Sequence, residues 1–131
     1  MRKKCDLNLN MAQILSQDQV NSDGWTTSIH CSYYAVFQYM KYLLAEKAAI
    51  SISYEEQDAQ DEDSHKYVIN EIKNRINDIN TARAIRQSIL DLKHRRVEAD
   101  YKPKIFTQEE ALDCKMRADA IIKNLKKLFR A

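Results

Sequence analysis

The scarcity of glycine and proline is the feature that most limits what this chain can fold into. Its 131 residues include one glycine, Gly24, and one proline, Pro103. Strands and hairpins need frequent tight turns, and those turns favour Gly, Pro or Asn. With so few residues that interrupt helices, the sequence predicts an all-α fold of long helices joined by short connections. The length corresponds to one domain, which we place at residues 1–131.

Apolar residues recur at three- and four-residue steps, as amphipathic helices require. A first short helix is predicted over 7–18, and its apolar stripe consists of Leu7, Met11, Ile14 and Leu15. Gly24 is then expected to break the chain. A second helix follows over 28–49, with a wide apolar stripe that is typical of a central bundle helix.

The segment 50–64 has no apolar period and contains six acidic residues within 55–63, so we expect a loop. A third helix is predicted to start near Ser64. Its stripe continues to about Ala99, either as one rod or as two helices, and Pro103 ends it. The letters TQEE at 107–110 form a capping box that opens the last helix. The pattern predicts an up-and-down four-helix bundle, with or without a short extra helix.

Charge is unevenly distributed along the chain. Residues 1–64 carry five Lys/Arg and ten Asp/Glu, whereas residues 65–131 carry sixteen Lys/Arg and nine Asp/Glu. A basic half suits a polyanion such as RNA. The two halves can equally neutralise each other within one fold or across a dimer, and the sequence leaves both interpretations open.

The cysteines favour a reducing compartment. Cys5, Cys31 and Cys114 are odd in number and widely spaced, so we expect reduced thiols in a cytoplasmic protein with no metal site and no cofactor. No apolar run approaches the roughly 20 residues that span a bilayer. The basic N-terminus lacks the apolar core of a signal peptide.

Three pieces of the sequence line up in a recognisable order. They are HCSYYAVFQYMKYLLAEK, then SHKYVI, then RRVEADYKPKIFTQEEALDCKMRADAIIKNL. Their order and spacing resemble the HEPN family (higher eukaryotes and prokaryotes nucleotide-binding domain) over about residues 28–128. The most specific piece is R-x-x-A-D-Y followed by the capped final helix.

The resemblance implies a helical bundle that commonly dimerises, and many members of the family are metal-independent ribonucleases. Members often act as toxins paired with a nucleotidyltransferase-like antitoxin. The resemblance thus implies a homodimeric, RNA- or nucleotide-associated domain of the prokaryotic toxin–antitoxin or defence type. The alternative is a catalytically inactive dimeric module that binds a nucleotidyltransferase-like partner or a nucleotide.

In the ribonucleases of the family, an Arg-x(4–6)-His motif lies at the dimer interface. Histidine can take the 2′-OH proton near neutral pH, and arginine stabilises charge on the phosphate. Here Asp100 follows Arg95, and Tyr101 follows Arg96, after four intervening residues, so no histidine stands in the motif.

The candidate site residues follow from this motif and from the second helix. The catalytic candidates are Arg95, Arg96 and Asp100, and the candidates for RNA or nucleotide binding are Arg95, Arg96, Tyr101, His30 and Tyr33. His30 can replace the absent base if the fold brings it close. Each residue also has a structural interpretation: the charged residues as a solvated, salt-bridged helix end, and the tyrosines as core or dimer interface. His65, at the start of the third helix, is expected to be a neutral structural histidine.

Overall fold

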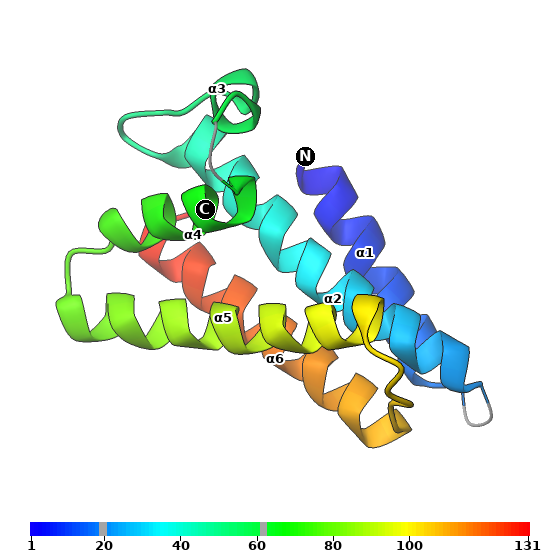
Figure 1. Cartoon of the computed structure of the whole chain (residues 1–131). Coiled ribbons are helices and arrows are strands. Elements are labelled where there is room, and N and C mark those ends of the chain that lie inside the picture. The colour runs from blue at the N-terminus through cyan, green and yellow to red at the C-terminus, as the bar shows by residue number, and fades with distance from the viewer. Residues whose placement is uncertain (19–20, 61–62) are drawn as a thin grey trace.

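The chain folds into antiparallel helices packed around one central helix (Figure 1). The structure, a computed structural model, describes residues 1–18, 21–60 and 63–131. Over these ranges it contains helices and no strand, which confirms the predicted all-α fold. The elements are α1 (Arg2–Ser16), α2 (Ser22–Tyr42), the π-helical turn η1 (Leu43–Lys47), α3 (Tyr54–Asp58), α4 (Ser64–Asn74), α5 (Ile79–Tyr101) and α6 (Gln108–Phe129).

The central helix is α2, which contacts α1, α4, α5 and α6. Its apolar stripe predicted this position. The helix buries large side chains on most of its circumference, and Ile29, Tyr33, Val36 and Met40 are fully buried. The loop between α5 and α6 adds Phe106, which is also fully buried and which helical periodicity could not reveal.

The start of α2 differs from the prediction. Gly24 was expected to break the chain, but it lies inside the first turn of α2. The helix begins earlier because the side chain of Asn21 caps it, accepting a hydrogen bond of 3.1 Å from the Gly24 backbone N–H. A glycine in a helical sequence lowers helix stability, but a good cap three residues before it can outweigh that cost.

The apolar stripe of α1 was expected to face the core, but most of it is exposed to solvent. A helix was predicted over 7–18, and α1 runs from Arg2 to Ser16. In it, Leu7, Met11 and Ile14 are 60%, 46% and 55% exposed. The buried face of α1 instead carries small residues, Cys5 and Ala12 among them. Small side chains allow α1 to approach α2 closely, and the Ser28 hydroxyl donates a buried hydrogen bond of 2.7 Å to the Ala12 carbonyl.

The acidic segment is not entirely a loop. It contains the short helix α3, which Ser53 and Glu56 open with a capping box. Gln57 is fully buried and its side chain donates hydrogen bonds to the carbonyls of Ile52 and Lys41, at 2.9 and 3.1 Å. Part of the predicted acidic loop, residues 61 and 62, lies outside the described residues.

The later helix boundaries agree well with the sequence. The third helix starts at Ser64, as predicted, and α4 and α5 are separate helices because Asp78 caps α5. The helix α5 ends at Tyr101, just before Pro103, as predicted. The capping box between Thr107 and Glu110 opens α6, which confirms that prediction as well. In the ranges that the structure covers, every helix is too short or too polar to cross a membrane.

Candidate functional site

The last turns of α5 point the two neighbouring arginines in different directions. Adjacent residues on a helix diverge by about 100°. Arg96 therefore faces the tyrosines of α2, whereas Arg95 faces the start of α6. Two separate groups of polar side chains result, one on each side of α5.

The first group surrounds Arg96, whose side chain is only 8% exposed. Its guanidinium lies over the rings of Tyr33 and Tyr34, 5.0 and 5.5 Å from their centroids. Its Nη1 is 3.5 Å from Oδ2 of Asp100. Such cation–π contacts are strong when the cation is desolvated. Arg96 is therefore held between α2 and the end of α5, and little of it is open to a ligand.

His30, on α2, meets the same carboxylate from the solvent side. Its Nδ1 lies 2.8 and 3.0 Å from the two oxygens of Asp100, a residue 70 positions away in the sequence. The His30 ring also packs on Tyr34, with centroids 4.6 Å apart. When Nδ1–H donates to the carboxylate, Nε2 of the neutral ring remains a proton acceptor. The side chain of His30 is 43% exposed, so a ligand can reach the ring.

Behind this pair, His65 completes an aromatic layer. The Tyr33 hydroxyl lies 2.7 Å from Nδ1 of His65, and the His65 ring stacks on Phe37 with centroids 4.0 Å apart. Burial, together with the positive charge of Arg96, lowers the pKa of His65 to about 4. His65 is therefore neutral near neutral pH, as expected from the sequence, and its neutral ring accepts the hydrogen bond from Tyr33.

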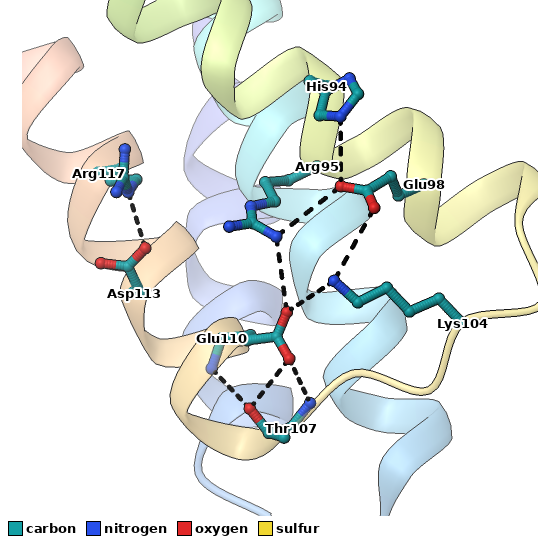
Figure 2. Close-up of polar contacts among 8 residues, drawn as sticks. All are labelled: His94, Arg95, Glu98, Lys104, Thr107, Glu110, Asp113 and Arg117. Carbon is teal, nitrogen blue, oxygen red and sulfur yellow. Dashed lines mark hydrogen bonds and ion pairs between the residues drawn. The ribbon is translucent and has the colours of Figure 1, made fainter.

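The second group, which we call the Arg95 groove, lies between α5 and α6. It is a shallow space of about 390 Å³ lined by Asp91, His94, Arg95, Glu98 and Arg117. Figure 2 shows how Glu98 and Glu110 link Arg95 and Lys104, with N–O distances of 3.3 to 3.8 Å.

Opposite charges balance one another in this groove. Arg117 bonds Asp113 at 2.7 Å, and His94 lies 3.5 Å from Glu98. Glu110 also belongs to the capping box of α6. Partial burial raises its pKa, but its hydrogen bonds with Lys104 and with Thr107 outweigh this effect and lower the pKa overall. The network joins α5, the connection after it and α6. Its balanced charge makes it a weaker attractor of anions than the count of arginines suggests.

The structure brings together only some of the candidate residues. His30, Arg96 and Asp100 lie in contact, with Tyr33 directly behind them. Arg95 lies on the other side of α5, so the two arginines do not share a site. Tyr33 is fully buried, which corrects the expectation that its ring binds RNA or nucleotide.

Tyr101 is 73% exposed, so its ring is not part of the core. The link from His30 to Asp100 could not be read from sequence spacing. The one available signal was the helical phase, which puts His30 and Tyr33 on neighbouring turns of one helix face.

Cys5, Cys31 and Cys114 are free thiols, and all three are buried. Burial raises the pKa of Cys5 to about 12 and that of Cys114 to about 11, so neither thiol forms a thiolate readily. Among the described residues, no group of three or more His, Cys, Asp or Glu side chains is arranged to hold a metal ion. The contact of His30 Nδ1 with both oxygens of Asp100 is the arrangement best suited to acid–base chemistry among the candidate residues.

Comparisons with known proteins identify no relative. No protein-family model matches this chain, no curated protein matches it, and no solved structure matches it.

Proposed function

We propose that this chain is a HEPN-like, RNA-associated domain that cleaves RNA by metal-independent transesterification, with His30 as the general base. The observation that carries the proposal is the contact of His30 Nδ1 with both oxygens of Asp100, at 2.8 and 3.0 Å. The motif of the family lacks its histidine here, and His30 from another helix meets the residue that stands in its place.

In the proposed reaction, Nε2 of His30 takes the proton of a ribose 2′-OH. The 2′-oxygen attacks the adjacent phosphorus, the bond from phosphorus to the 5′-oxygen breaks, and the departing oxygen takes a proton from solvent. A 2′,3′-cyclic phosphate and a 5′-OH remain. Asp100 orients the ring and stabilises the imidazolium, as carboxylates do for catalytic histidines. Arg96 holds Asp100 and adds positive charge near the site.

A second candidate is the catalytically inactive module, which binds a nucleotide or a nucleotidyltransferase-like partner. One observation favours it: neither arginine stands free beside His30. Arg96 is 8% exposed, and Arg95 points away towards Glu110. In that case the His30–Asp100 contact serves as a clamp between α2 and α5.

The two candidates are separated by incubating the purified protein with mixed RNA oligonucleotides in EDTA between pH 5 and 9. We expect cleavage that leaves cyclic phosphate ends and that fails on RNA carrying 2′-O-methyl groups. His30→Ala is expected to lower the rate by about 10²-fold or more, because general-base catalysis contributes about 10²–10⁴-fold. Asp100→Asn is expected to lower it less.

His94→Ala is the matched control, because His94 is 75% exposed and lies in the Arg95 groove. This variant should cleave at the wild-type rate. Circular dichroism and thermal melting establish that each variant is folded. If the wild-type protein cuts no RNA at any of these pH values, the ribonuclease proposal fails. Retained nucleotide or partner binding would then support the inactive module.

A further inference from the structure

The outer face of α1 carries an apolar stripe that no part of the described chain covers. Leu7, Met11 and Ile14 follow one another at helical steps and are 60%, 46% and 55% exposed. A surface helix normally turns its large apolar residues inward. Here the fully buried positions are the small residues Cys5 and Ala12, and Leu9 packs partly buried against the core. Leu7, Met11 and Ile14 instead point to solvent. Figure 1 shows α1 at the outer edge of the bundle, alongside α2.

Charges at the two ends of the stripe have opposite signs. Lys3 and Lys4 are exposed in the first turn of α1, and Asp18 follows its last turn. The first turn contains no acidic residue and the last turn no basic residue, so the charges of α1 do not complement its own dipole. Over the ranges that the structure describes, the side chains of Lys3 and Lys4 form no ion pair.

The spacing makes the stripe complementary to an antiparallel copy of itself. Met11 stands midway between Lys4 and Asp18, seven residues from each, and Leu7 and Ile14 flank it. A two-fold axis near Met11 therefore sets Leu7 against Ile14 of the partner and places the lysines beside Asp18 of the partner. The lysines then also face the negative end of the partner helix dipole. A parallel pair would bring like charges together.

We propose that α1 is a homodimer interface, in which two copies of the chain pair their α1 helices antiparallel about a two-fold axis near Met11. This arrangement is isologous, so it closes at two subunits. It lies on α1 and not on the motif helix α5, and it does not depend on RNA cleavage. The partner is a second copy because the stripe complements itself in both shape and charge.

Sedimentation velocity and light scattering across protein concentrations test the proposal. We expect a concentration-dependent dimer that Met11→Lys weakens by at least about tenfold, because the substitution places two charges on the axis. Met116→Lys is the matched control, since Met116 is 71% exposed on α6, and this variant should dimerise as the wild type does. Both substitutions are on the surface, so melting curves should stay unchanged at concentrations where the wild type is monomeric.

A charge exchange tests the antiparallel register. Lys4→Glu and Asp18→Lys should each weaken the dimer, and the double variant should restore it. Met11→Cys should form an intersubunit disulfide under mild oxidation, whereas Met116→Cys should not, and the native thiols are buried. A chain that is monomeric at high concentration, or a dimer indifferent to Met11→Lys, overturns the proposal. So does a monomer that uses this face to bind vesicles of anionic lipid.

Discussion

Acidification should destabilise this protein through His65, whose neutral ring the fold requires. The Tyr33 hydroxyl donates to Nδ1 of His65, and Arg96 holds a positive charge nearby. The pKa of His65 is about 4 in the folded protein, against 6.5 for an ordinary histidine. Between these two pH values the unfolded chain binds more protons than the folded chain. The contribution of His65 to the free energy of unfolding is therefore fully present above about pH 6.5, and it is lost as the pH falls towards 4.

The size of the effect follows from the shift. One pKa unit corresponds to about 1.36 kcal/mol, and the full shift would remove about 2 kcal/mol between pH 7.5 and 5.0. The ring of His65 is only half-buried, and solvent screens such interactions. We therefore expect a loss of about 1 kcal/mol from this one residue.

Urea unfolding at pH 7.5 and 5.0, followed by helical circular dichroism, measures this loss. His65→Phe keeps an aromatic ring against Phe37 but cannot take a proton. The single variant is expected to be less stable at both pH values, because the Tyr33 hydroxyl loses its hydrogen-bond acceptor. The double variant Tyr33→Phe, His65→Phe removes this hydroxyl and with it the unsatisfied donor. Both variants should lose about 1 kcal/mol less than the wild type on acidification.

Two results would refute this account of His65. One is an equal loss of stability on acidification in the wild type and in His65→Phe. The other is an NMR titration that places the pKa of His65 near 6.5. His94→Ala, at an exposed position, should lose as much stability on acidification as the wild type.

The remaining predictions concern stability. Gly24→Ala should stabilise the protein by about 0.5–1 kcal/mol in thermal unfolding, because the added methyl meets Asn21 and Leu15 at ordinary contact distances of 3.5 and 3.6 Å; a lower melting temperature would contradict this. Thr107→Ala should cost about 1 kcal/mol through loss of the α6 capping box, and Thr107→Ser should recover most of it. Arg96→Ala should cost about 2 kcal/mol in urea unfolding, because it removes two cation–π contacts and a partner of Asp100. Arg95→Ala, on the exposed side, should cost less than about 0.5 kcal/mol, and equal effects of the two substitutions would refute the assignment of their environments.

Local signals in the sequence located three helix boundaries in the second half of the chain. The capping box at Thr107, the stop before Pro103 and the start at Ser64 depend on residues within one or two turns, so the sequence alone suffices to find them. The prediction was wrong at Gly24, where two local signals competed and the cap from Asn21 prevailed over the glycine.

Part of the candidate site was also accessible from the sequence. The family resemblance drew attention to Arg95, Arg96 and Asp100, and the second helix supplied His30 and Tyr33. The sequence does not show which arginine contacts α2, because that depends on the rotation of α5 about its axis. A difference of 100° between neighbours separates a buried Arg96 from an Arg95 that is 44% exposed.

The sequence by itself determined that this chain is helical, because one glycine and one proline leave few places for turns and apolar residues recur at helical steps. Only the tertiary structure decided which face of each helix is buried. Periodicity shows that α1 has an apolar stripe but not that Cys5 and Ala12 are buried while Leu7, Met11 and Ile14 face solvent. Likewise, the pairing of His30 with Asp100 arises from packing between helices that are far apart in the chain, and no local rule encodes such a contact.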